Sequence, residues 1–185
     1  MALAINEETG NKNWAAININ NIGNIYYIQG EKAGSGNYDK TALYQRALEH
    51  YLRALKIRET IGDKQGIASS YISLGLINIR LSKFDEARKY MADALSFSKK
   101  IGYKEAIKSS YAGLATLDSA AGNWQAAYAN HKQFVIYRDS LINEENTRKS
   151  IHAEMSFTFD KKEQLLKEEQ EQEKQKQLIV IVSVS

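Results

Sequence analysis

Two asparagine side chains are the strongest candidates for binding chemistry in this sequence. Asn20 and Asn24 lie four residues apart in a stretch crowded with asparagine, so on a helix they would share one face, with Tyr27 on nearly the same side. A side-chain amide can donate and accept hydrogen bonds at once, which suits it to holding a peptide backbone. We therefore predict a peptide-binding groove at Asn20, Asn24 and Tyr27, with Arg80 and Asp118 at its rim. The alternative interpretation of the asparagines is a solvated helix face.

The residue types that carry catalysis and metal binding are scarce. The 185-residue chain has no cysteine, which removes thiol catalysis, disulfides and cysteine-based zinc sites. His50 and His131 have no partner at metal-ligand spacing, and we interpret both as packing residues. Gly34-Ser35-Gly36 lacks the Lys-Ser/Thr pair of a phosphate-binding loop and is interpreted as a flexible turn, with a ligand-contacting loop as the alternative. We predict no catalytic residue, no metal site and no cofactor.

The composition is that of a folded protein with long helices. Apolar residues make up 43% of the chain and charged residues 25%, which is ordinary for a folded domain. There is no proline, where average usage of about 5% would supply roughly nine, so long uninterrupted helices are favoured. A net charge of +3 is too weak to indicate a nucleic-acid partner.

Self-comparison reveals a repeat, which decides the expected fold. Residues 61–74 align with residues 101–114, an offset of 40, through matching isoleucine, glycine, lysine, Ser-Ser-Tyr and leucine positions. The start of the chain aligns at the larger offset of 52, which places an insertion between Tyr27 and Ala42. Residues 2–10 match only the end of a unit, so we expect further repeats to precede residue 1.

Each repeat predicts two amphipathic helices. In the second unit, apolar side chains recur at helical spacing over residues 67–81 and, after a break at Ser82-Lys83, over residues 84–95. Gly62 and Gly102 stand where one unit meets the next, as glycines at helix ends do. One helix pair cannot bury both apolar stripes, whereas stacked pairs can, so the repeat is the expected unit of the core.

This pattern resembles the tetratricopeptide repeat family over about residues 2 to 140, with a long period of 40 and without the closing proline. The resemblance implies an all-α fold, a right-handed superhelical solenoid of helix pairs followed by a long C-terminal helix. It also implies that the face bearing Asn20 and Asn24 lines a concave groove. The family's clamp for C-terminal carboxylates is not reproduced, because small residues stand where lysines and an arginine are needed. The repeat-defining residues are Gly23, Tyr26, Ala47, Tyr71, Gly75, Ala87, Tyr111, Ala115 and Ala127.

Three segments follow the solenoid of residues 1–140. Residues 141–160 predict a helix that caps the last repeat. Residues 161–177 are Lys, Glu or Gln at 15 of 17 positions, which favours an exposed helix or a loose coiled coil through which a homodimer could form. Residues 178–185 are apolar or small and are interpreted as the truncated start of a transmembrane helix, since a full span needs about 20 apolar residues.

This order of segments resembles the sensor region of bacterial membrane-bound signalling proteins, above all the sensor histidine kinases of two-component systems. The resemblance implies a protein or peptide ligand, a membrane anchor and no enzyme activity in this region. It places the repeats in the periplasm, whereas Lys174 and Lys176 before the apolar run favour the cytoplasm. The alternatives are a soluble scaffold for complex assembly and the sensor region of a membrane-bound DNA-binding regulator.

Overall fold

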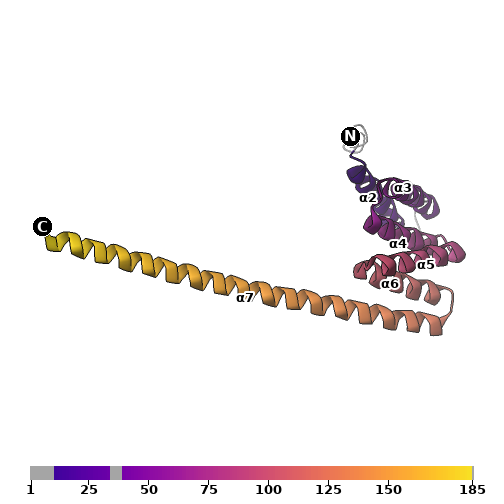
Figure 1. Cartoon of the computed structure of the whole chain (residues 1–185). Helices are drawn as coiled ribbons and strands as arrows, with labels where there is room; N and C mark the ends of the chain where they lie inside the picture. The colour runs from indigo at the N-terminus through magenta and orange to yellow at the C-terminus, as the bar shows by residue number, and fades with distance from the viewer. Residues whose placement is uncertain (1–10, 34–38, 185) are drawn as a thin grey trace. The chain divides into compact units, whose positions relative to one another are not determined.

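The computed structural model describes residues 11–33 and 39–184, and these residues form six helices and no strand. The helices are α2 (Lys12–Lys32), α3 (Lys40–Ile61), α4 (Lys64–Arg80), α5 (Phe84–Ile101), α6 (Lys104–Ala120) and α7 (Trp124–Val184). Figure 1 shows the consecutive helices α2 to α6 lying side by side. Each repeat contributes one helix pair: α2 with α3, α4 with α5, and α6 with the start of α7. The prediction of an all-α solenoid is confirmed.

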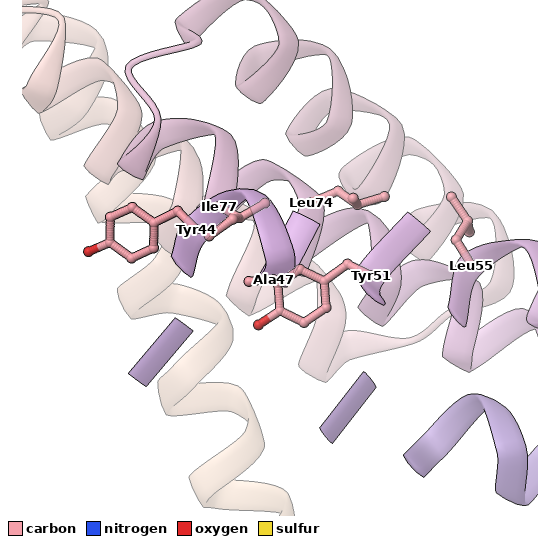
Figure 2. Close-up of a cluster of buried hydrophobic side chains, with 6 residues drawn as sticks. All are labelled: Tyr44, Ala47, Tyr51, Leu55, Leu74 and Ile77. Atoms are coloured by element: carbon pink, nitrogen blue, oxygen red, sulfur yellow. The ribbon is translucent and has the colours of Figure 1, made fainter. Parts of the chain in front are cut away.

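The core is continuous between neighbouring helix pairs, as the repeat argument requires. One cluster joins α3 to α4, and Figure 2 shows its six buried side chains: Tyr44, Ala47, Tyr51, Leu55, Leu74 and Ile77. A second cluster joins α4, α5 and α6 through Ile79, Ala87, Met91, Leu114 and Leu117. The helices are therefore held by apolar contacts that cross from each pair to the next.

Two of the predicted repeat-defining glycines mark close approaches of neighbouring helices. A Cβ at Gly23 would lie 2.8 Å from a ring carbon of Tyr51, and a Cβ at Gly75 would lie 2.8 Å from Cγ of Met91. Both distances are shorter than carbon contacts allow. Small residues at these positions let the second helix of each pair lie directly against the first.

Four links between helices share one hydrogen-bond pattern. At each link a residue one or two positions after the end of the helix has a positive φ: Gly62 (69°), Ser82 (57°), Gly102 (71°) and Gly122 (77°). The next amide then donates to the carbonyl five residues back, as from Lys83 to Asn78 at 2.9 Å, which is the Schellman ending of a helix. The prediction that Gly62 and Gly102 end helices is confirmed.

Helix α7 runs without a break through the predicted boundaries at residues 140, 160 and 177. The chain divides into two compact units after Asp139, so the predicted capping of the last repeat by residues 141–160 concerns a contact between units and stays a prediction. No helix among the described residues combines the length and the apolar character needed to cross a membrane. The partial repeat at residues 2–10, the Gly34-Ser35-Gly36 turn and the side chains of residues 178–185 lie outside the described part of the chain.

Candidate functional site

The two asparagines of the predicted groove lie on α2 and bind side chains of α3. The amide oxygen of Asn24 accepts a hydrogen bond of 2.8 Å from the Tyr51 hydroxyl, and that of Asn20 accepts one of 3.3 Å from the Arg58 guanidinium. Burial raises the pKa of Tyr51 to about 12. Both amide oxygens therefore help to hold α2 against α3, and contact with a peptide stays a prediction.

Tyr27 and Arg80, two residues of the predicted groove, lie together in a cluster that links α2 to α4. The Arg80 guanidinium lies 5.8 Å from the centre of the Tyr27 ring and forms two hydrogen bonds, of 2.8 and 3.2 Å, with the carboxylate of Glu31. The Tyr44 hydroxyl donates to the same carboxylate. Hydrogen bonds from Arg80 and Tyr44 lower the pKa of Glu31, while burial and Glu31 raise that of Tyr44.

Asp118 lies apart from that cluster and is buried, with only 1% of its surface exposed, instead of standing at an open rim. Its carboxylate accepts hydrogen bonds of 2.6 Å from Arg88 on α5 and 2.8 Å from Asn130 on α7. A carboxylate with donors on both neighbouring helices ties three helices together, which explains its burial.

Arg58 is a buried polar centre that sequence reasoning missed. From α3 it donates to the carbonyl of Gly66 at 3.2 Å and to the Ser70 hydroxyl at 2.6 Å, both on α4, in addition to Asn20 on α2. Asp63, the N-cap of α4, lies 3.9 Å away. Burial lowers the pKa of Arg58. An arginine within the small and apolar stripe of α3 was the signal that could have identified it.

The histidines differ from each other in their surroundings. His50 stacks on Tyr26 at 5.4 Å between ring centres, and burial lowers the pKa of His50. His131, which the sequence predicts to be packed, is exposed and lies 5.7 Å from the ring of Phe134. Among the side chains that the structure describes, no group of three or more His, Asp or Glu is placed to hold a metal ion.

An open groove of about 740 Å³ lies between α6 and the start of α7. Two large aromatic side chains stand exposed in it, Trp124 at 69% and Tyr128 at 73%. Its remaining lining combines small, hydroxyl and aromatic residues: Ala112, Ala115, Thr116, Ser119, Ala120, Ala127, His131 and Phe134.

This groove exists because the third helix pair is uncovered where the first two are covered. Tyr44 holds the position in α3 that Trp124 holds in α7, 80 residues later, yet Tyr44 is only 2% exposed because side chains of both α2 and α4 pack against it. Ala47 and Ala87 are fully buried, whereas Ala127 of the third repeat is partly exposed. Residue type alone could not distinguish the buried side chains from the exposed ones, since an aromatic residue or an alanine at a repeat position predicts a core residue in every repeat.

The fold and these contacts define a protein built from stacked helix pairs. Residues 36–100 match the Tetratricopeptide repeat family, whose repeats serve protein interaction. No curated protein matches the chain. Among solved structures, the crystal structure of BtubC (BKLC) from P. vanneervenii is similar, at 20% sequence identity and a TM-score of 0.48. The likeness covers 75% of this chain and 60% of that one, so the chain spans less than two thirds of that protein's length.

Proposed function

We propose that the repeats bind a protein or a peptide and that the chain is the sensor region of a membrane-anchored bacterial signalling protein, specifically a two-component sensor histidine kinase. The observation that carries the binding role is the open groove with exposed Trp124 and Tyr128. Exposed aromatic side chains in a concave apolar setting are typical anchors of protein interfaces. On this proposal the region itself has no enzyme activity.

The membrane and signalling part of the proposal has separate support. The aliphatic run begins at Leu178, directly after the charged residues 161–177, and its backbone continues α7 as a helix to Val184. A helix is the conformation that a membrane span requires, because every backbone group must be hydrogen-bonded within it. A soluble scaffold, the competing function, would instead bury this short segment inside a protein.

The binding role is tested by capture of partners from the bacterial extract with variants of the chain. Trp124→Ala with Tyr128→Ala should lose the partner that the wild-type chain captures. The matched control is Trp14→Ala, which removes another exposed tryptophan from α2, at the other end of the helix stack. Asn20→Ala with Asn24→Ala tests the predicted α2 site separately. Capture that persists in every variant would contradict both sites.

The membrane anchor is tested by the codons that follow Ser185 in the gene. Twelve or more further apolar residues, which would complete the roughly 20 needed for a span, are the expected result. A polar continuation would remove the receptor function and favour the scaffold. An alkaline phosphatase fused in place of the repeats should be active if they are periplasmic, and inactive if they are cytoplasmic.

A further inference from the structure

Helices α2 and α4 hold the same place in the repeat, yet their matching faces differ in chemistry. Asn24 and Tyr27 of α2 correspond, at the offset of 52 residues, to Leu76 and Ile79 of α4. Asn20 lies one turn earlier on the same face, and its counterpart in α4 is also an isoleucine. This face is therefore polar on α2 and aliphatic on α4.

On α4 the aliphatic face packs against α6. Ile79 is buried in the cluster that contains Leu114 and Leu117 of α6, and Leu76 is partly buried against that cluster. The backbones of α4 and α6 accordingly lie close together. Separating these two helices would expose apolar surface to water, at a free-energy cost that grows with the exposed area. We therefore expect α4 and α6 to move as one body.

On α2 the polar face is used within the first helix pair. The amide oxygens of Asn20 and Asn24 accept hydrogen bonds from Arg58 and Tyr51 of α3. The backbones of α2 and α4, which the structure describes over their whole length, approach each other less closely than those of α4 and α6. The junction between α2 and α4 thus lacks the row of aliphatic contacts that joins α4 to α6.

Arg80 of α4 provides a polar link across this junction. Its guanidinium binds both carboxylate oxygens of Glu31 and lies over the ring of Tyr27. The side chains of Arg80 and Glu31 are 35% and 37% exposed, so water and salt reach the ion pair. When an exposed ion pair separates, water replaces its hydrogen bonds and little free energy is lost. The junction can therefore open at a lower cost than the contact between α4 and α6.

The first helix pair stays attached to α4 through α3. The buried cluster of Figure 2 joins α3 to α4, and Arg58 of α3 binds the Gly66 carbonyl and the Ser70 hydroxyl in the first turns of α4. Helix α3 also packs along α2. The pair of α2 and α3 is thus fixed to α4 on one side by apolar contacts and linked on the other by an exposed ion pair, an arrangement that permits a hinge.

We propose that the junction between α2 and α4 is a hinge of the solenoid. The pair of α2 and α3 swings about the contact between α3 and α4, the ion pair of Glu31 and Arg80 opens and closes, and α4, α5 and α6 move as one body. Because salt screens an exposed ion pair, a rise in ionic strength favours the open form. The movement belongs to the free chain and does not depend on the proposed binding of a partner.

Distances between spin labels test the hinge, because the chain has no cysteine and an introduced pair is labelled uniquely. Ile28→Cys with Lys83→Cys measures across the junction between α2 and α4. Lys83→Cys with Asn123→Cys is the matched control between the second and third repeats, and all three positions are exposed. From about 0.01 M to about 1 M salt, the first distance distribution should widen and shift to longer distances. The control distribution should stay unchanged.

Glu31→Gln tests whether the ion pair holds the junction closed. The substitution keeps the length of the side chain and removes its charge, so the distribution between positions 28 and 83 should be wide at low salt and should no longer respond to salt. Glu105→Gln, which removes an ion pair with Lys108 inside α6, should leave the salt response intact. Circular dichroism checks that each variant keeps its helices. If Glu31→Gln does not fold, the salt titration of the labelled chain with Glu31 in place decides the question.

Three results would overturn the proposal. A distribution between positions 28 and 83 that is as narrow as the control and insensitive to salt would show a rigid junction. Equal widening of both distributions would show that the whole stack flexes without a hinge. Widening between labels at Asn21→Cys on α2 and Glu49→Cys on α3 would show that α2 leaves α3, so that the first pair does not move as a unit.

Discussion

At the scale of single residues, the buried charges lie where helices of different repeats meet. Arg58 and Asp118 are 7% and 1% exposed, and each has hydrogen-bond partners on helices before and after its own. Burial of a charge is costly unless such partners replace the lost water. Each of these residues therefore stabilises the stack only while both neighbouring helices are in place.

Replacing Arg58 by Met should destabilise the chain by about 3 kcal/mol, because the acceptors on α2 and α4 lose their buried donor. Arg138→Met is the matched control: it occupies the same register position but is 46% exposed, and it should change the free energy of unfolding by less than about 0.5 kcal/mol. Urea unfolding of both variants measures the difference. Equal losses would show that the buried hydrogen bonds of Arg58 contribute nothing beyond packing.

The buried Tyr51 makes stability depend on alkaline pH. Its pKa of about 12 exceeds the value of about 10 expected in the unfolded chain, so the folded state holds the phenolic proton more tightly. The contribution, up to about 2–3 kcal/mol, is complete below pH 10 and is lost as the pH rises from 10 towards 12. In Tyr51→Phe the fall in unfolding free energy over this range should be shallower. Urea unfolding at a series of pH values tests this, with the exposed Tyr128→Phe as control; the same slope in Tyr51→Phe as in the wild type would refute it.

At the scale of elements, the four positive-φ links recur every 20 residues, which is half the repeat. Three of them hold glycine, and the fourth holds Ser82, the only non-glycine residue with positive φ in the described chain. An L-residue with a side chain is disfavoured in this conformation. The link at Ser82 therefore carries backbone strain that the links at Gly62 and Gly102 avoid.

Ser82→Gly should raise the free energy of unfolding by about 0.5–1 kcal/mol. Glycine adopts the left-handed conformation without strain, and this gain is partly offset because glycine also increases the entropy of the unfolded chain. Gly102→Ala should lower it by about 1 kcal/mol, since a Cβ there meets no atom within 4 Å and only the backbone conformation is penalised. Thermal or urea unfolding of the two variants measures effects of opposite sign. Effects of the same sign would mean that packing, not φ, governs these links.

The sequence predicted the elements well because helix periodicity and glycine endings are local signals. Residues 67–81 and 84–95 lie almost wholly within α4 and α5, and Gly62 and Gly102 end helices as expected. The positive φ of Ser82 was missed, since a serine alone does not indicate a left-handed residue. The candidate site was harder to predict: Asn24 and Asn20 bind Tyr51 and Arg58, which are 27 and 38 residues away. The exposure of Trp124 depends on whether another helix covers it, and its residue type does not reveal that.

At the scale of the whole solenoid, the protection of backbone amide hydrogens from exchange should increase with the number of helices that each helix contacts. Helix α4 contacts α3, α5 and α6, whereas the start of α7 borders the open groove with α6. We expect amide hydrogens of α4 to exchange slowest and those of residues 124–134 to exchange faster, because terminal elements open with less loss of contact. Hydrogen exchange read by mass spectrometry tests this order, and uniform protection from α2 to residue 134 would contradict it.

The four links between helices recur at equal spacing, so the solenoid is an array of short units in which each unit contacts its nearest neighbours. In such an array, a partner bound in the groove between α6 and α7 would add one more coupled interface, and the gain in stability would be greatest in the third helix pair and decline towards the first. Ligand occupancy would then be readable as a thermal shift that grows with ligand concentration. On the proposed function, binding at the groove between α6 and α7 would thus help to determine how much of the array stays folded.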